Sequence, residues 1–141
     1  MNEMIGKSSE TAPWPKAIYA ITLFVEDLQA AKEFYHRAFG LPIVFEDDSS
    51  GVFKFGSVLI NLLSVSAAKE LVEPATIAGR ESGSRLVLTI NVDNVDTLCA
   101  ELAARGVQLL NGPMDRPWGI RTASFADPAG HIWEIAQSLA S

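Results

Sequence analysis

The sequence predicts an α+β fold in which two βαβββ modules form a cup-shaped mixed sheet with the helices outside. Apolar residues change from alternating to helical spacing twice along the chain. The two places where they do so can be aligned, with Val25 on Val92, Asp27 on Asn94 and Gly40 near Gly106, roughly 66 residues apart. A repeated unit of this size indicates that one copy cannot bury its apolar face alone. Two open sheets lying side by side around a shared cup meet this need.

Length and composition limit the classes of protein. The 141 residues fit one domain, and 48% hydrophobic with 20% charged residues exclude wholesale disorder. A net charge of -6 argues against nucleic acid as a partner, because phosphates repel an acidic chain. The single cysteine excludes a disulfide framework and a multi-thiolate zinc site. No apolar run approaches the roughly 20 residues that span a bilayer, so we expect no membrane association.

The first residues predict no regular structure. Residues 1–15 contain Pro13 and Pro15 and lack the continuous apolar segment of a secretory signal. We therefore expect a flexible leader at 1–15, a single domain at 16–138 and a cytoplasmic location.

Module one is predicted at 16–65. Its first strand, 17–25, is apolar on both faces, which predicts that it is covered on both sides. Asp27 is a suitable helix N-cap, and Gly40 ends the helical spacing that follows it. Three further strands are predicted at 41–46, 51–56 and 57–64.

A linker at 66–84 is predicted to join the modules. It begins with a segment long enough for one or two helical turns and continues rich in Gly, Pro and Ser. Module two, 85–138, repeats the pattern with a strand at 84–92 and a helix that Asn94 caps. Gly106 ends this helix, and three strands follow at 107–112, 118–127 and 131–138.

Three segments carry a resemblance to a known family. VEDLQAAKEFYHRAFGLPIVFE, VDNVDTLCAELAARGV and PWGIRTASFADPAGHIWEI occur in this order, and the resemblance covers residues 16–138. The chain resembles the glyoxalase/bleomycin resistance/dioxygenase superfamily, also called vicinal oxygen chelate proteins. The resemblance implies a cup for a small molecule, often with a divalent metal, and a homodimer whose cups are often built from both subunits.

The metal positions that the resemblance implies lie on the first and fourth strand of each module. Here they are occupied by Ala20, Asn61, Val87 and Glu134. Two of these side chains have no donor atom, and one carboxylate with one amide is too few for a divalent cation. We therefore expect no metal and no cofactor, and none of the metal-dependent isomerisation, epimerisation, ring-cleavage or thiol-addition reactions of resembling proteins.

The side chains predicted to contact a ligand share one face of the strands or stand at its edge. They are Glu134, Trp118, Arg121, Asn61, Thr22, Phe24 and Thr89. A mostly apolar wall with a few polar groups is typical of small-molecule sites. Trp118 can stack on a planar ligand or cap the edge of the core. Arg121 can meet a carboxylate, either of the ligand or of Glu134, and Glu134 can instead be a remnant paired with Arg121 or Arg85.

Three further residues have structural interpretations. Trp133 alternates away from Glu134 and is predicted to pack under a helix. His131 follows the turn sequence DPAG and is predicted to face solvent. Cys99 lies on the apolar stripe of the second helix, where a buried thiol is inert.

Two functions remain after these exclusions. The favoured one is a binding protein that sequesters or senses a partly aromatic small molecule, such as an antibiotic, without making or breaking a bond. The competing one is a lyase, isomerase or dioxygenase that uses Glu134 as a base or as a sole carboxylate ligand. A regulatory scaffold is also open, because 66–84 has the length of a lid. The ligand, and whether one chain or two build the cup, are not predicted.

Overall fold

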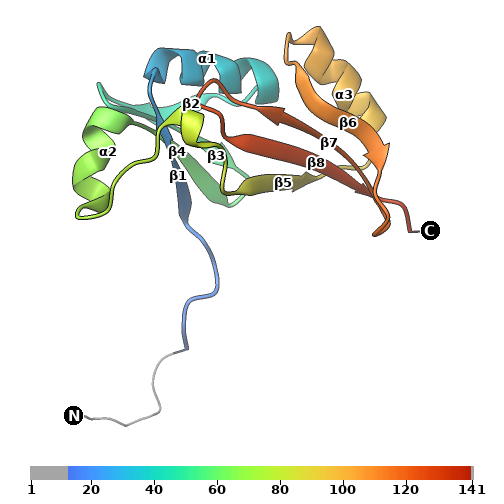
Figure 1. The fold of residues 1–141 in the computed structure, drawn as a ribbon, viewed down its shortest axis with the longest axis horizontal. Helices are drawn as coiled ribbons and strands as arrows, with labels where there is room; N and C mark the ends of the chain where they lie inside the picture. Colours follow the sequence, from blue (N-terminus) through green and yellow to red (C-terminus); the bar gives the residue numbers. More distant parts are fainter. Residues whose placement is uncertain (1–12, 141) are drawn as a thin grey trace.

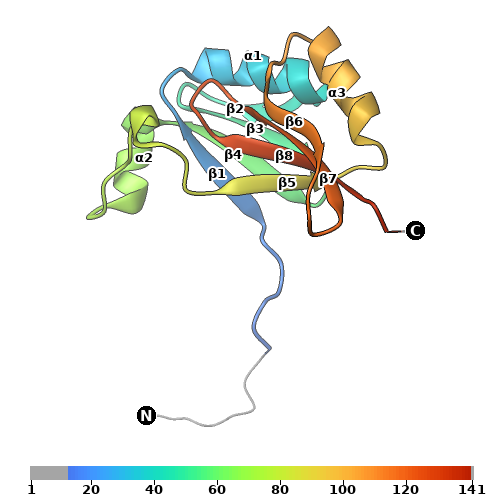
Figure 2. The ribbon, with the colours of Figure 1, turned by 45° about the vertical axis from the view of Figure 1, so that its right-hand side comes forward.

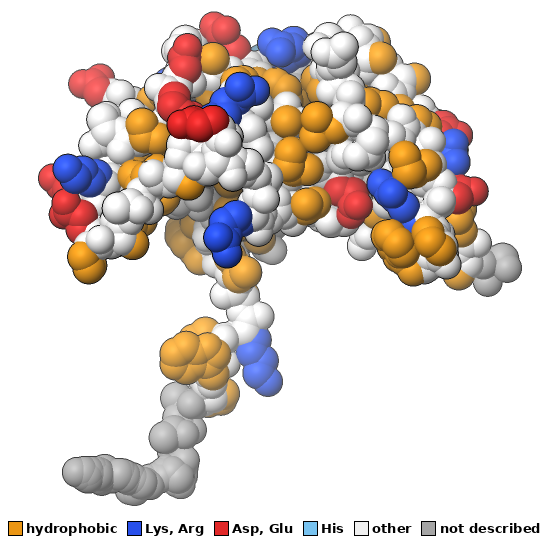
Figure 3. All heavy atoms as spheres, viewed as in Figure 1, with side chains coloured by type: hydrophobic (Ala, Val, Ile, Leu, Met, Phe, Trp, Pro, Cys, Tyr) orange, Lys and Arg blue, Asp and Glu red, His pale blue; other side chains and the backbone are white. Residues whose placement is uncertain are grey.

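A computed structural model describes residues 13–140; residues 1–12, most of the predicted leader, and residue 141 lie outside the described part. Two four-stranded sheets have the orders β1-β4-β3-β2 and β5-β8-β7-β6 (Figure 1). This confirms the predicted α+β fold of two βαβββ modules. Residues 13–19 have no regular structure and run away from the sheets, with hydrophobic and basic side chains along them (Figure 3).

The first module follows the predicted order of elements. They are β1 (Ala20–Val25), α1 (Leu28–Phe39), β2 (Ile43–Glu46), β3 (Ser50–Phe55) and β4 (Val58–Ser64). β1 pairs with β4 in parallel, and β3 pairs antiparallel with β2 and β4. The Asp27 side chain accepts a hydrogen bond from the backbone N–H of Ala30 at 3.0 Å. Gly40 ends α1 with a φ of 69°, so both predicted ends of this helix are confirmed.

The second module repeats the pattern after a connection that is partly helical. The elements are α2 (Val65–Val72), the 3₁₀ turn η1 (Arg80–Ser82), β5 (Val87–Asn91), α3 (Val95–Ala104), β6 (Leu109–Asp115), β7 (Ile120–Ala126) and β8 (Ile132–Ser138). The predicted linker thus opens with two turns of helix, and Ala68 of α2 is fully buried. Asn94 caps α3 through a 3.0 Å hydrogen bond from the backbone N–H of Thr97. Within residues 13–140, no helix is both long and apolar enough to cross a membrane.

Both modules share one hydrophobic core. Helices α1 and α3 lie on the same side of the sheets in both ribbon views (Figures 1 and 2). Phe39 of α1 lies 5.0 Å from Trp133 of β8, ring centre to ring centre, so a helix of module one packs on the sheet of module two. The predicted burial of Trp133 is confirmed, since it is 3% exposed. The side of β1 away from the helices is open, with Ala20 exposed and Phe24 half-buried, so the prediction of a strand covered on both sides is wrong for a single chain.

A buried polar network crosses the contact between the modules. The Tyr35 hydroxyl of α1 donates to Asp127 Oδ2 and accepts a hydrogen bond from Trp133 Nε1 at 2.9 Å. Asp127 is 2% exposed, and its Oδ1 accepts from the backbone N–H groups of Ala129 and His131. The His131 ring nitrogen Nδ1 lies 2.8 Å from Asp127 Oδ2. The prediction that His131 only faces solvent is therefore wrong, because it is a partner of a buried carboxylate.

The network holds Asp127 ionised and Tyr35 protonated. Burial by itself raises the pKa of Asp127, but hydrogen bonds from His131 and Tyr35 outweigh it and leave the pKa below its ordinary value. Burial, followed by the charge of Asp127, raises the pKa of Tyr35, which therefore stays a hydrogen-bond donor. The negative charge of Asp127 thus holds Tyr35 of the first module and His131 of the second in place.

Removing the Tyr35 hydroxyl tests the contribution of this network. We expect Tyr35→Phe to lower the free energy of unfolding by roughly 1–3 kcal/mol, because Asp127 and Trp133 each lose a partner in a buried place. Urea unfolding followed by tryptophan fluorescence measures the loss. Tyr19→Phe is the matched control, since Tyr19 is 78% exposed. Equal stability of the two variants would contradict the role assigned to the network.

The pH dependence of stability follows from the lowered pKa of Asp127. Because this pKa is lower in the folded chain than in the unfolded one, folding favours the carboxylate. Its contribution is present above the unfolded value of about 3.9 and is lost as the pH falls through the folded value. We expect Asp127→Asn to flatten this acid limb in urea unfolding from neutral pH downward. Parallel curves for the two proteins would exclude Asp127 as its source.

Candidate functional site

The strand faces turned away from α1 and α3 form what we call the open face. Its members alternate with residues that face the core, which are buried on β1, β4 and β8 and half-buried on β5. They are Thr22, Phe24, Leu59, Asn61 and Leu63 of the first sheet and Val87, Thr89, Asn91, Ile132 and Glu134 of the second. Each is exposed or half-buried in the single chain. The open face therefore contains five of the seven predicted ligand residues.

The repeat places an equivalent polar pair on each half of the open face. Thr22 lies opposite Asn61, whose Nδ2 donates to Thr22 Oγ1 at 3.4 Å. Thr89 lies opposite Glu134, and its hydroxyl donates to Glu134 Oε1 at 3.0 Å. One pair is neutral and the other carries a negative charge, so the two modules share a geometry but differ in chemistry.

The metal implied by the resemblance does not fit the donors on the open face. Ala20 and Val87 lie two residues before Thr22 and Thr89 and offer only hydrocarbon. In the part of the chain that the structure describes, no three His, Cys, Asp or Glu side chains gather as a metal site. Glu134 and the Asn61 amide remain, which are too few donors for a protein-held divalent cation.

Arg121 lies on the helix side of β7. Ser124 lies opposite Glu134, and Arg121 is three residues from Ser124, so it points to the other face of the sheet. Its guanidinium contacts Asp96 of α3 at 3.0 Å and Asp115 at 2.9 Å. Hydrogen bonds to Asp115 and Asp96 raise the pKa of Arg121. The contact between Arg121 and Glu134, one of the alternatives from the sequence, is therefore not formed.

Arg116, which sequence analysis missed, lies on the same face as Glu134. Its Nε donates to Thr122 Oγ1 at 2.9 Å, and its second terminal nitrogen donates to Asn111 Oδ1 at 3.3 Å. Ser124 of β7 pairs with Glu134, and Thr122 lies two residues before Ser124 on the same strand. Because side chains alternate along a strand, Thr122 lies on the face that carries Glu134.

The irregular course of β6 hides Arg116 from an alternation pattern. The pairing of β6 with β7 shifts register twice between Leu109 and Met114. Gly112 lies between these positions with a φ of 87°, and a Cβ there would come 2.5 Å from the Thr122 carbonyl oxygen. Only glycine allows this close approach of β6 to β7.

Trp118 and Cys99 have opposite environments. Trp118 stands in the turn between β6 and β7 and is 68% exposed, so it does not cap the edge of the core in the single chain. Stacking on a ligand stays a prediction for it. Cys99 is buried on α3, and burial raises the pKa of its thiol, as expected for an inert cysteine.

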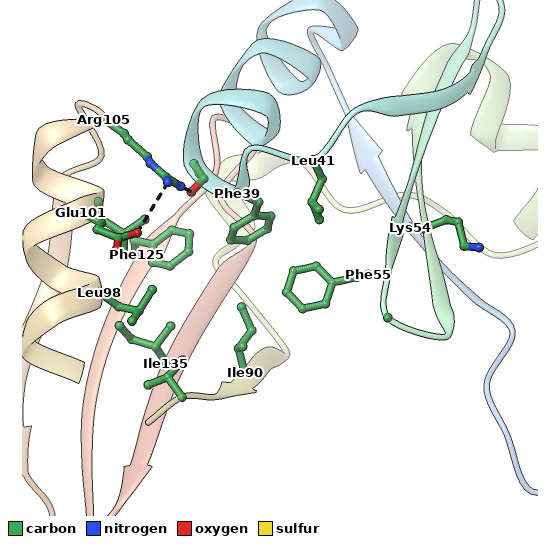
Figure 4. A pocket seen from close by; sticks show the side chains of 14 residues that line it. Phe39, Leu41, Lys54, Phe55, Ile90, Leu98, Glu101, Arg105, Phe125 and Ile135 are labelled. Atoms are coloured by element: carbon green, nitrogen blue, oxygen red, sulfur yellow. Dashed lines mark hydrogen bonds and ion pairs between the residues drawn. The ribbon is translucent and has the colours of Figure 1, made fainter. Parts of the chain in front are cut away.

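A cavity of about 400 Å³ lies between the modules, away from the open face (Figure 4). Its lining is Ala38, Phe39, Leu41, Lys54, Phe55, Gly56, Ile90, Val92, Leu98, Glu101, Leu102, Arg105, Phe125 and Ile135. Arg105 closes one side by donating to the Ala38 carbonyl at 2.9 Å and pairing with Glu101 at 3.5 Å. No sequence pattern predicted this cavity, because its walls come from both modules. None of the predicted ligand residues lines it.

The doubled βαβββ unit and its open face define a class of paired-module proteins. The chain belongs to the Glyoxalase/Bleomycin resistance protein/Dioxygenase superfamily, whose family model matches residues 17–135. It is 35% identical to the uncharacterized protein YraH of Bacillus subtilis (strain 168) over 124 residues, which are 84% of this chain and 96% of YraH.

Solved structures share the fold. A glyoxalase/bleomycin resistance protein/dioxygenase from Nocardioides matches with a TM-score of 0.83 at 24% identity, over 94% of this chain and 89% of that one. TnmS3, an antibiotic binding protein from Streptomyces sp. CB03234, matches with a TM-score of 0.67 at 26% identity, over 90% and 99%.

Asn61 offers a test of whether a polar side chain of the open face stabilises the fold. Its Oδ1 is buried and accepts no hydrogen bond from the described residues, which costs stability. We expect Asn61→Leu to leave the free energy of unfolding within about 1 kcal/mol of the parent or to raise it. Urea unfolding measures this. A loss above about 2 kcal/mol would mean that the amide is a structural group.

Proposed function

We propose that the chain binds a small, partly aromatic organic molecule on the open face and makes or breaks no bond in it. The observation that carries the proposal is the composition of this face, where the metal positions Ala20 and Val87 are hydrocarbon and the walls are apolar. Burial of apolar ligand surface supplies the affinity, at about 25 cal/mol per Å² before the costs of association. Apolar walls with few polar groups are typical of sites that bind small molecules in this way, by burying apolar surface.

The polar groups of the open face orient the ligand. The Thr89 hydroxyl holds Glu134 Oε1, while Oε2 accepts no hydrogen bond within residues 13–140 and is available to a donor on the ligand. Phe24 adds an aromatic wall, and Trp118 in the exposed turn adds a stacking surface.

A homodimer in the cytoplasm completes the proposal. The open face leaves apolar side chains exposed in the single chain, among them Val87 at 53%, and a second copy covering this face would enclose the ligand. The similarity to TnmS3, which is an antibiotic binding protein, supports an antibiotic-like ligand.

Glu134 supports a second candidate function. A carboxylate on an apolar face, with one oxygen fixed by a hydroxyl and the other without a donor in the described part of the chain, is placed to remove a proton from a bound molecule. The chain would then be a lyase, isomerase or dioxygenase, with Glu134 as a base or as one carboxylate ligand of an ion that the substrate helps to hold.

A thermal-shift screen of planar drug-like compounds against the purified chain tests the favoured function. We expect hits whose stabilisation grows with concentration and falls for Glu134→Gln, because the oriented acceptor is weakened. Glu33→Gln, on the exposed side of α1, is the matched control and should bind as the parent does. Leu98→Trp fills the cavity between the modules and should leave binding unchanged.

Two results would overturn the binding function. One is an absence of concentration-dependent hits across the screen. The other is stoichiometric zinc, nickel or iron in the purified protein by elemental analysis, lost in Glu134→Gln, which would establish the metal-dependent enzyme instead. Loss of binding in Leu98→Trp but not in Glu134→Gln would indicate that the ligand binds in the cavity between the modules and not on the open face.

A further inference from the structure

We propose that the ligand is an aromatic carboxylate. Arg116 binds its carboxylate group, and Glu134 accepts a hydrogen bond from a donor on the opposite side of the ring. The inference rests on the proposed function and names the chemical class of its ligand. The juxtaposition that carries it is a fixed guanidinium and a fixed carboxylate on the same face of the second sheet.

Arg116 is held in place by neutral partners. Thr122 and Asn111 accept from two of its nitrogens, and neither neutralises the charge. Within residues 13–140, no carboxylate lies within 4.0 Å of the guanidinium. The side chain is half-buried, and a cation partly removed from water gains from an anionic partner.

Arg121, on the same hairpin, shows the opposite arrangement. It contacts Asp96 and Asp115 on the helix side, so its hydrogen-bonding edge is used inside the protein. Among residues 13–140, Arg116 has no such pair, although the chain has a net charge of -6 and carboxylates are abundant. The guanidinium edge not used by Thr122 and Asn111 matches the planar, two-oxygen geometry of a carboxylate.

The spacing of the two charges suggests a ring between two substituents. Arg116 is fixed at Thr122, and Glu134 lies opposite Ser124, two residues along the same strand. Thr122, which holds Arg116, and Glu134 are therefore diagonal neighbours on adjacent strands, about 7–8 Å apart. A benzene ring with para substituents bridges such a span, with its carboxylate at Arg116 and its hydroxyl at Glu134. Figure 3 shows acidic, basic and hydrophobic side chains together in the region of β8, which suits an aromatic acid.

NMR titration with two isosteric probes tests the inference. 4-Hydroxybenzoate carries the charge, and 4-hydroxybenzamide has the same shape without it. In ¹H–¹⁵N spectra of the parent we expect 4-hydroxybenzoate to give a saturable shift of the Arg116 Nε–H resonance, with an affinity at least tenfold above that of the amide. Arg116→Gln should remove that tenfold preference, and Arg116→Lys should retain part of it.

Arg121→Gln is the matched control on the opposite face, and it should keep the preference within twofold. Well-dispersed spectra of each variant show that it is folded. Equal affinity for the two probes in the parent, or a preference that survives Arg116→Gln, would overturn the anionic ligand while leaving a binding function that the compound screen supports. The absence of a saturable shift with 4-hydroxybenzoate up to about 20 mM also overturns it. Failure of the compound screen as well would remove the binding function itself.

Discussion

The buried carboxylate of Asp127 is the constraint on which the arrangement of the molecule depends. A charge at 2% exposure must be surrounded by donors, and these come from the turn before β8 and from Tyr35 of the other module. Meeting that demand fixes α1 against the second sheet and fixes where β8 begins. Because side chains alternate along a strand, the start of β8 decides that Trp133 points into the core and Glu134 onto the open face. A structural requirement on one face thus sets the chemistry of the other.

Much of the fold could be predicted because its signals are local. The caps at Asp27 and Asn94, the helix end at Gly40 and the inward direction of Trp133 each depend on a few neighbouring residues. The pairs of Thr22 with Asn61 and of Thr89 with Glu134 follow from alternation once the repeat is recognised. The elements, and the face on which these candidate residues lie, were therefore within reach of the sequence.

What sequence analysis missed depends on contacts between distant residues. His131 looks like an exposed turn residue until Asp127 is known to be buried beside it. Arg116 follows a strand whose register shifts twice, so counting residues cannot assign its face. The cavity between the modules joins Phe55 of β3 to Leu98 of α3, and no single segment contains the information that would place them together.

The separation of Arg116 and Glu134 supports the proposed role of this face in ligand binding. Opposite charges on an apolar surface gain most from pairing with each other, yet here each is held by a neutral hydroxyl, Thr122 for the cation and Thr89 for the anion. The helix side of the same sheet shows that the chain does form such pairs, since Arg121 contacts two carboxylates there. Because the two charges are held apart, they do not stabilise each other. A ligand with an anionic group at one end and a hydrogen-bond donor at the other supplies a favourable partner to each of them.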